Sequence, residues 1–570
     1  MFSIEPIVNY RHERIFNSLF TDSFELHVLP RVLLVGLDGA SWEVLDPLIS
    51  KGELPNIEKL ISGGIKTRLR STIPFVSPTA WASLFTGKNP GKHAIFGNLV
   101  ARGLDPDPPP VTARDRKTKP IWTLLSEMGR RVIVINVPFT YPPDNVNGFM
   151  VSGLPIPGPH SVFTIPQSLK GEIFSRWPTY SVKPLRSTLR HRPQDWLRQG
   201  KEDIESKTQL AFLLMDKVEW DFLAIVYRDG DHLGHFHFGE SVIDEYYKIV
   251  DDNLGKLFAR IEEDTSIIIV SDHGQCKIKR QFFMNSWLIA NGFLRKYQRF
   301  TVRDLVLLAL INTLKLFGIR DSLNPTSPSG IPQRLSHYTT HGPVRAIASM
   351  LSWGGAKIAP NEIDWAKTKV GSMPSSHSNS LRVNLKGRET VGAVESKDYD
   401  AFIRMLSEKL LAIIDPTTQE RIFDRILRRD DIYSGPFVEE APDLLIVPTR
   451  GYSVSSRVLV PKLTGPGRAS EGNHDTHGIL LISGRGTLQS PEVPDEANIL
   501  DIAPTIFHLL GCPLDPEMDG VVLDRIVAAP SLTTKQKVDD TYVRTESEKE
   551  YLREKLQLLR ERQDHKGRSL

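Results

Sequence analysis

Short runs of apolar residues recur along the chain and end in polar or glycine-containing turns. They begin near residues 31, 131, 221, 266 and 477 and read RVLLVGLDG, RVIVINVP, DFLAIVYRDGD, SIIIVSDHG and HGILLIS. Between them lie amphipathic helical patterns, for example at 42–64 and 244–263. Near-continuous apolar strands that alternate with such helices are typical of a mostly parallel sheet covered on both faces. The pattern therefore predicts an α/β fold, a three-layer sandwich around a mostly parallel central sheet.

The residues that directly follow these runs are the first candidates for function. In open parallel sheets the ligand site lies beyond the carboxyl ends of the strands. The residues at these positions are Asp38, Asp231 and the pair Asp272 and His273. We expect these side chains to meet at one edge of the sheet.

The alternation of strands and helices stops between residues 293 and 360. There a basic, apolar helical pattern is followed by the turn-rich sequence NPTSPSGIPQ. We interpret this segment as an inserted cap on a catalytic domain that spans residues 30–525. Residues 1–29 are predicted to be an N-terminal extension, and residues 526–570 a charged helical tail that is either solvated or used for self-association.

Composition and charge exclude some classes of partner. The chain has 570 residues, of which 40% are apolar and 24% charged, an ordinary globular mixture. Its 71 basic and 68 acidic residues leave a net charge of +3, which gives no general attraction to nucleic acid. No binding to a nucleic-acid polymer is expected.

The cellular location is predicted from cysteines and apolar segments. Cys276 and Cys512 are the two cysteines, so a disulfide framework is excluded and a reducing compartment is favoured. The N-terminal sequence MFSIEPIVNYRHERIF carries charges where a signal peptide is apolar. The apolar run at 305–319 contains Lys315 and is shorter than the ~20 residues of a spanning helix, which favours a buried or amphipathic helix over membrane contact. The sequence predicts a cytoplasmic protein with no membrane partner.

Carboxylates and imidazoles, without thiolates, make up the candidate set. His235 stands four residues after Asp231, and His474 in EGNHDTHG completes the set. Such donors suit zinc or manganese in catalytic sites with open coordination positions. Six ligands are enough for two ions, and two ions about 4 Å apart assist in-line phosphoryl transfer and activate a serine or threonine hydroxyl. Taken singly, each turn is also compatible with a structural role, such as a capping aspartate.

A hydroxyl for this chemistry is supplied by PFVSPTAWASLFTG, which contains Ser77, Thr79 and Ser83. Serine is a favoured N-cap and proline a favoured first helical residue, so SP indicates that Ser77 caps a helix. Ser77 then stands at the positive end of the helix dipole, beside backbone N–H groups that favour an anionic phosphate. Thr79 points less directly at that position, and Ser83 is expected in the core.

These segments resemble the type I phosphodiesterase and nucleotide pyrophosphatase family of the alkaline phosphatase superfamily. The residues that carry the resemblance are LLVGLDGAS, SPTAWASLFTGKNPGKHAIFG, DGDHLGH, IIIVSDHGQ and GNHDTHG, supported by DWAKTK, LRVNLKGRET and DIAPTIFHLLG. They extend from about residue 31 to about residue 525 and so cover most of the chain.

The resemblance implies an alkaline phosphatase-like fold and two divalent metal ions, Zn²⁺ or alternatively Mn²⁺. It implies two groups of ligands, Asp38, Ser77, Asp272 and His273 for one ion, and Asp231, His235 and His474 for the other. It also implies a covalent phosphoryl or nucleotidyl intermediate on the hydroxyl, which metal-activated water hydrolyses.

The sequence departs from the family at the nucleophile segment. In the family the nucleophile stands nine residues before the Thr of a Thr-Gly pair, and counting back from Thr86 selects Ser77, with Thr79 as the fallback. Thr79 stands where the family more often has Pro. Ala80 stands where an Asn often holds a phosphate oxygen. The candidates to replace that Asn are the N–H groups at the helix start, Asn98 and the basic residues Lys277, Lys279 and Arg280.

Several other motifs are excluded, and three further histidines are alternative ligands. GKNPGKH is not a nucleotide-binding P-loop, because three residues separate its glycines and no Ser or Thr follows the Lys. SPTAW lacks the Arg of a sulfatase motif, and no G-x-S-x-G or H-E-x-x-H is present. If His235 or His474 is not a ligand, the substitutes are His232, His237 and His477.

The main prediction is a two-metal hydrolase of phosphodiester or pyrophosphate bonds that acts on a small phosphorylated or nucleotide-like substrate through Ser77. The alternatives are a phosphomonoesterase, a phosphotransferase or mutase of the same superfamily, and a non-catalytic binding protein that keeps the fold.

Overall fold

The computed structural model describes residues 30–100, 103–104, 108–182, 192–297, 356–357, 362–372, 379–458, 463–467, 471–488 and 491–528. The chain divides into two compact units, Met1–Ala529 and Pro530–Leu570, and the described residues all belong to the first. The predicted N-terminal extension, most of the predicted cap and nearly all of the charged tail lie outside the described residues.

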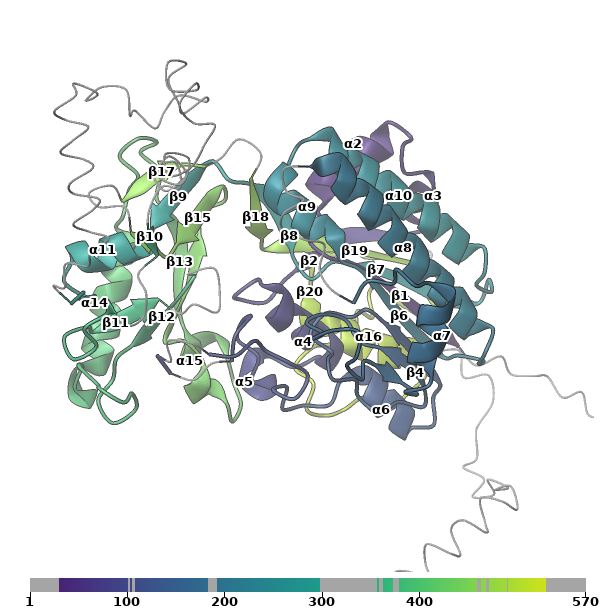
Figure 1. Ribbon diagram of the computed structural model, residues 1–570, viewed down its shortest axis with the longest axis horizontal. Helices are drawn as coiled ribbons and strands as arrows, with labels where there is room; N and C mark the ends of the chain where they lie inside the picture. The colour runs from purple at the N-terminus through teal and green to yellow at the C-terminus, as the bar shows by residue number, and fades with distance from the viewer. Residues whose placement is uncertain are drawn as a thin grey trace, which may run out of the picture. The chain divides into compact units, whose positions relative to one another are not determined.

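The largest sheet among the described residues has nine strands in the order β20-β2-β19-β7-β1-β6-β3-β4-β5, and several of them are labelled in Figure 1. Its strands are β1 (Arg31–Leu37), β2 (Gly64–Arg70), β3 (Val132–Ile135), β4 (Gly148–Val151), β5 (Thr164–Ile165), β6 (Phe222–Tyr227), β7 (Thr265–Val270), β19 (His477–Gly484) and β20 (Glu496–Asn498). The first four apolar runs of the sequence become β1, β3, β6 and β7, which lie next to one another and pair in parallel. The fifth run, β19, is antiparallel to both of its neighbours. The prediction of a mostly parallel central sheet is confirmed.

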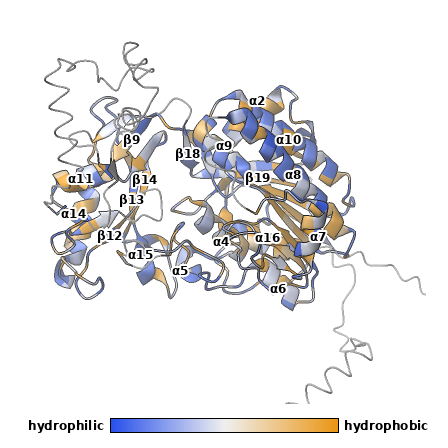
Figure 2. Cartoon of the chain, viewed as in Figure 1, coloured by the Kyte–Doolittle hydropathy of each residue, from blue (hydrophilic) through white to orange (hydrophobic). Residues whose placement is uncertain are grey.

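Helices cover both faces of this sheet, and each face has its own apolar core. Alternate residues of β1 point to opposite sides, so Leu33 and Val35 join one core while Val32 and Leu34 join the other. The first core is closed by α2 (Trp42–Ser50), α3 (Pro55–Ser62), α7 (Leu169–Arg176), α8 (Pro193–Met215) and α10 (Ser241–Phe258). The second is closed by α4 (Ser77–Thr86), α6 (Ile121–Glu127) and α16 (Ile502–Leu509). In Figure 2 the strands of the sheet are mainly hydrophobic, whereas α8 and α10 mix hydrophobic and hydrophilic residues, as amphipathic covering helices do.

A second, four-stranded antiparallel sheet has the order β11-β12-β14-β13. Its strands are β11 (Val370–Ser372), β12 (Ser380–Val383), β13 (Phe423–Arg428) and β14 (Leu444–Pro448). It shares a separate apolar core with α11 (Met284–Ala290), α14 (Tyr399–Leu411) and the strands β9 (Arg280–Phe283) and β15 (Tyr452–Ser455). The sequence patterns did not predict this sheet, because its strands are short and come from segments that are far apart in the chain.

None of the helices in the described part of the chain combines the length and the apolar character that crossing a bilayer requires. The apolar run at 305–319 lies outside that part.

Candidate functional site

Residues from five separate segments meet beyond the carboxyl ends of β1, β6 and β7. Asp38 directly follows β1, and Asp272 and His273 follow β7 after a single serine. Asp231 and His235 lie on α9 (Asp229–His237), the helix that follows β6. Because β1 pairs in parallel with both β6 and β7, these three strand ends share one edge of the sheet.

Two further elements complete this cluster. His474 belongs to β18 (Gly472–Asp475), which pairs with β8 (Gly274–Lys277) so that His474 lies opposite Gln275. Ser77 is the first residue of α4. The structure therefore brings together the hydroxyl, the three carboxylates and the three imidazoles that the sequence selected as metal-ligating residues.

Asp38, Asp272 and His273 form the first half of the cluster. Their candidate ligand atoms lie within 4.8 Å of one another, and all three residues are buried. The Nε2 atom of His273 lies 3.3 Å from Asp272 Oδ2 and 3.9 Å from Asp38 Oδ1. Ser77 Oγ lies 3.2 Å from that Nε2 atom and 3.5 Å from Asp38 Oδ1. The hydroxyl thus adjoins the same space as the three candidate ligands.

Asp231, His235 and His474 form the second half. Asp231 Oδ1 lies 3.5 Å from His235 Nε2 and 3.4 Å from His474 Nε2, and the two Nε2 atoms are 3.1 Å apart. The two halves are continuous, since the rings of His273 and His474 are stacked with their centroids 3.8 Å apart.

The three imidazoles share one hydrogen-bonding pattern. The Nδ1 atoms of His235, His273 and His474 lie 3.2, 3.0 and 3.0 Å from the backbone carbonyl oxygens of Gly472, Gly274 and Phe75. A carbonyl oxygen can only accept, so each Nδ1 carries a proton, and in the neutral form of each ring Nε2 carries the lone pair. Those lone pairs face each other and the carboxylates. Backbone carbonyls orient metal-binding histidines in this way.

The three carboxylates of the cluster, Asp38, Asp231 and Asp272, also lie close to one another, and this changes their pKa values. Burial, and then the charges of Asp272 and Asp231, raise the pKa of Asp38 well above its usual range. Burial and the charge of Asp231 raise the pKa of Asp272 to about 7. Burial opposes ionisation of Asp231 too, yet His235 and His474 bring its pKa well below the usual range. Asp272 Oδ2 is buried and has no hydrogen-bond partner among the described residues. Converging lone pairs and an unpartnered buried carboxylate oxygen fit divalent cations.

Ser77 begins its helix one position earlier than the capping pattern predicts. The N-cap of α4 is Val76, and no side chain caps the helix. Ser77 is therefore the first helical residue, and its hydroxyl faces the cluster instead of the helix backbone. One turn later, Trp81 Nε1 donates to Asp38 Oδ2 across 3.3 Å. Trp81 is buried in the core, and it also orients a carboxylate of the cluster.

The other hydroxyls of this segment lie elsewhere. Thr79 is fully buried, and in the described part of the chain its hydroxyl has no hydrogen-bond partner. Ser83 is also fully buried, with Oγ 2.7 Å from Nε2 of His93. No described hydrogen bond joins Thr79 to the cluster.

Asn98, Lys277, Lys279 and Arg280 were the side-chain candidates for oxyanion stabilisation. Among the described residues, no interaction connects their side chains with the cluster. The guanidinium of Arg280 makes a bidentate pair with the buried Asp415, at 2.8 and 3.0 Å. Lys277 and Lys279 are exposed. Asn98 is partly buried, and its backbone carbonyl accepts from Val111.

The three alternative histidines, His232, His237 and His477, lie beside residues outside the cluster. His237 Nδ1 lies 2.7 Å from Glu240, and His477 Nε2 lies 2.8 Å from Glu496. The ring of His232 lies beside Trp196, with the centroids 6.4 Å apart.

Gln275 is a residue of the cluster that sequence reasoning missed. Its Nε2 donates to Oδ1 and to the backbone oxygen of Asp231, both at 2.8 Å. A Cβ at Gly234 would lie 1.6 Å from Gln275 Oε1, so any side chain at this position of α9 would have to displace the Gln275 amide. The signal was present in IIIVSDHGQ, where Gln275 follows the candidate ligands by two residues. The backbone N–H of Gly39 also donates to Asp272 Oδ1, at 3.3 Å.

A mostly parallel sheet with a buried aspartate and histidine cluster at the strand ends, next to a serine at a helix start, defines a phosphoester hydrolase with the alkaline phosphatase fold. The chain belongs to the type I phosphodiesterase / nucleotide pyrophosphatase family, whose model matches residues 32–479. It is accordingly an enzyme of this class of hydrolases, and the predicted family and fold class are confirmed.

Solved structures that are similar to this chain have low sequence identity to it. The alkaline phosphatase PafA is 15% identical with a TM-score of 0.50, and the match covers 88% of this chain and 99% of PafA. Human ectonucleotide pyrophosphatase / phosphodiesterase 5 is 14% identical with a TM-score of 0.45, covering 87% of this chain and 99% of that one. Phosphonoacetate hydrolase from Sinorhizobium meliloti is 13% identical with a TM-score of 0.47, covering 85% and 95%. No curated protein matches the sequence.

Proposed function

We propose that the protein is a two-metal hydrolase of phosphodiester or pyrophosphate bonds, with Ser77 as the nucleophile and a small phosphorylated or nucleotide-like substrate. The observation that carries the proposal is the convergence of the His235, His273 and His474 Nε2 atoms and three buried carboxylates beside the Ser77 hydroxyl. This geometry supports the assignment better than a structural role, because buried lone pairs and carboxylates in such proximity repel one another without cations.

The residues fall into two ligand groups. One ion would be held by Asp38, Ser77, Asp272 and His273, and the other by Asp231, His235 and His474. Zinc is the preferred ion for this mixture of imidazole nitrogens and carboxylate oxygens, with manganese as the alternative. When bound, the ions supply positive charge that favours the ionised serine and the developing charge on the phosphoryl oxygens.

In the proposed reaction, Ser77 Oγ loses its proton to solvent and forms a bond to phosphorus as the bond to the leaving oxygen breaks, and the leaving oxygen takes up a proton from solvent. Water then attacks the same phosphorus, and Ser77 Oγ is released and regains a proton. The hydroxyl stands at the N-terminus of α4, where backbone N–H groups favour the negative phosphoryl oxygens. These N–H groups are the preferred replacement for the absent Asn at position 80, because Arg280 is already paired with Asp415.

A turnover assay tests this function and separates it from the alternatives. The purified protein, with and without added zinc or manganese, is given an aryl phosphodiester and an aryl phosphomonoester. We expect metal-dependent hydrolysis with preference for the diester. Preference for the monoester would instead support a phosphomonoesterase. An absence of metal-dependent hydrolysis of either ester would contradict the proposal.

A further inference from the structure

Helix α9 carries two of the three proposed ligands of the second ion, Asp231 and His235, and it begins two residues before Asp231. No side chain among the described residues caps its first turn, since the N-cap residue is Arg228 and makes no capping hydrogen bond. The backbone N–H of Asp231 donates to the Arg228 carbonyl oxygen at 3.3 Å. Contacts other than a cap must therefore fix the place where α9 begins.

The start of α9 packs closely against the segment that carries Asp38. A Cβ added to Gly39 would lie 3.0 Å from Asp231 Cα. A Cβ added to Gly230 would lie 3.4 Å from the Asp38 carbonyl oxygen. Asp38 and Asp231 belong to different ligand groups, so a shift of the first turn of α9 changes the spacing of the two groups.

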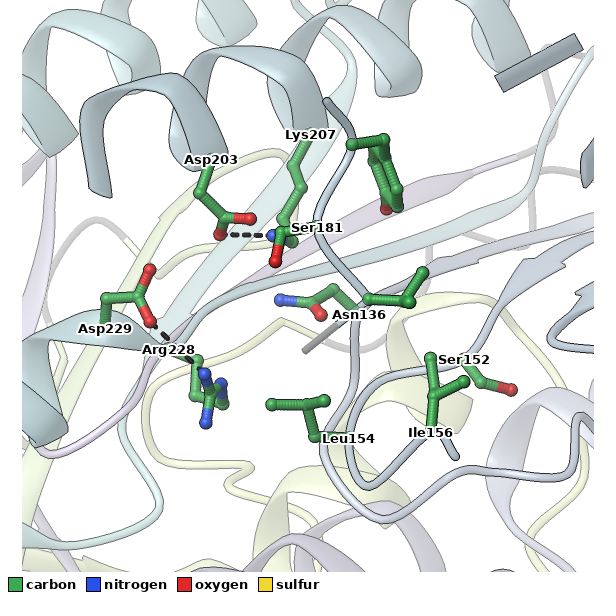
Figure 3. A pocket seen from close by; sticks show the side chains of 11 residues that line it. Asn136, Ser152, Leu154, Ile156, Ser181, Asp203, Lys207, Arg228 and Asp229 are labelled. Carbon is green, nitrogen blue, oxygen red and sulfur yellow. Dashed lines mark hydrogen bonds and ion pairs between the residues drawn. The ribbon is translucent and has the colours of Figure 1, made fainter. Parts of the chain in front are cut away.

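Two buried ion pairs lie beside this first turn. Lys207 pairs with Asp203 on α8, and Arg228 Nη2 lies 3.3 Å from Oδ1 of Asp229, the first residue of α9. The four side chains are 3%, 13%, 14% and 4% exposed in that order. Figure 3 shows both pairs around one space. The pair on α8 thus adjoins the pair at the start of α9.

The four charges act on one another across this space. Burial, and then the charge of Asp203, raise the pKa of Asp229 to about 6. The charges of Arg228 and Lys207 oppose that rise. Charges interact more strongly in a protein interior than in water, so the two pairs form one network.

Hydrogen bonds also join α8 to the cluster through the end of β6. Thr208 Oγ1, on α8, lies 2.7 Å from the hydroxyl of Tyr227, the last residue of β6. The Tyr227 carbonyl oxygen accepts from the backbone N–H of Asp38 at 3.0 Å. Helix α8 is therefore linked to Asp38 through Tyr227, and its Asp203 is linked to the helix that carries Asp231.

The space between the two pairs is too small for a ligand to be the reason for these charges. Its volume of about 10 Å³ is room for about one water molecule. Stability is not a sufficient reason either, because apolar residues of the same volume often replace a buried ion pair without loss. Buried charges can instead specify one arrangement of the chain. The two pairs compensate each other only while α8 and the start of α9 keep their relative position.

We propose that Asp203 and Lys207 are positioning residues, which hold the first turn of α9 against α8 and so keep Asp231 where the second ion binds. They act through α9 and contact neither ion nor substrate. This inference rests on the proposed function, because the ion at Asp231 is part of it. Loss of the pair should weaken the binding of one ion even where the stability of the fold is kept.

Replacing the pair as a unit separates positioning from stability. Asp203→Leu combined with Lys207→Met removes both charges and keeps most of the volume, so the Tm should stay close to that of the wild type. We expect one of the two zinc affinities, measured by chelator competition at pH 8, to fall about 10-fold while the other is unchanged. Lys207→Met alone leaves Asp203 without its cation and should lower both the Tm and that affinity. Recovery of the Tm and of the affinity together in the double variant would overturn the proposal.

Glu205→Gln is the matched control. Glu205 pairs with Lys201 on the same helix and at the same four-residue spacing, but the two side chains are 42% and 55% exposed. The Tm and both zinc affinities should be unchanged. A 10-fold loss of zinc affinity in this variant too would show a general effect of charge on α8 and would overturn the proposal.

Hydrogen exchange measured by mass spectrometry locates the effect without metal. In the metal-free double variant, the amides of α9 should exchange faster than in the wild type, whereas those of α10 should not change. Faster exchange in α8, α9 and α10 alike, or no change in α9, would overturn the proposal. Failure of the proposed function is recognised separately, because the wild type then binds no zinc and hydrolyses no ester. The exchange of α9 still decides whether the pair positions this helix.

Discussion

His273 Nε2 lies 3.2 Å from Ser77 Oγ, although the two residues are 196 positions apart in the chain. His273 is placed by the end of β7, and Ser77 by the first turn of α4. The ring is fixed from its other side by the Gly274 carbonyl oxygen, so the lone pair of Nε2 faces the hydroxyl. This relationship singles out Ser77 from the other hydroxyls of its segment.

Replacing Ser77 with Ala is expected to lower hydrolysis by at least ~1,000-fold, because it removes the proposed nucleophile. The other six ligands remain, so elemental analysis should still find two metals per chain. Thr79→Val is the matched control. It removes a buried hydroxyl that has no partner among the described residues, so activity should be nearly unchanged and Tm equal or higher. If Thr79→Val abolished turnover and Ser77→Ala did not, the nucleophile would be Thr79.

Replacing Asp272 with Asn is expected to remove one of the two metals. The substitution keeps the shape of the side chain but removes the charge of a fully buried carboxylate that is proposed as a ligand. Metal analysis after dialysis against a weak chelator should fall from two ions to about one, with loss of activity. Retention of both ions would show that Asp272 is not a ligand.

The sequence predicted much of the central sheet and the site, for one physical reason. Buried parallel strands are apolar throughout, so their ends are visible in the sequence, and Asp38, Asp272 and His273 stand there. Asp231 and His235 were predicted from their four-residue spacing and lie on one helix. His474 was selected from EGNHDTHG, but its grouping with Asp231 and His235 was implied by the family resemblance, because it precedes an apolar strand and is placed by the pairing of β18 with β8.

The features that were missed depend on contacts between distant segments. The second sheet is built from short strands whose pairing no local pattern specifies. The place of Gln275 in IIIVSDHGQ marks it as a neighbour of the candidate ligands, but its role becomes apparent only when its amide meets Asp231. Lys207 of α8 and Arg228 at the end of β6 line one space, and no local sequence pattern indicates that these two residues come together.

Acid is expected to destabilise the protein through Asp443, which directly precedes β14 of the second sheet. Burial opposes ionisation of Asp443, but hydrogen bonds and charge from Arg388, together with Tyr399, hold its pKa below the usual value. A carboxylate with a lowered folded-state pKa stabilises the fold fully above the unfolded-state value of about 3.9. That contribution is lost as the pH falls below about 4, through the folded-state pKa.

Asp443→Asn tests this pH dependence. At pH 7 the variant removes the bidentate carboxylate partner of Arg388, which keeps only Glu389 as a carboxylate contact, and should lose about 1.5–3 kcal/mol of unfolding free energy. The difference from the wild type, measured by urea unfolding, should shrink as the pH falls below about 4. Asp424→Asn is the control, because its partner Arg425 is an exposed neighbour and the expected change is below about 0.5 kcal/mol. A difference that does not vary with pH would exclude Asp443 as the titrating group.

Gly234 and Gln275 are expected to act as one unit in positioning Asp231. Gln275→Ala removes the amide that donates to Asp231 Oδ1, and loss of such a positioning contact should weaken metal binding by about 10–100-fold. Gly234→Ala should have a similar effect, because the new Cβ would displace Gln275 from its place. In the double variant the displaced side chain is absent, so its metal affinity, measured by chelator competition, should match that of Gln275→Ala alone. If the losses of metal affinity in the two single variants add up in the double variant, Gly234 is needed for the backbone conformation of α9 itself. Asp231 is then held independently of Gln275.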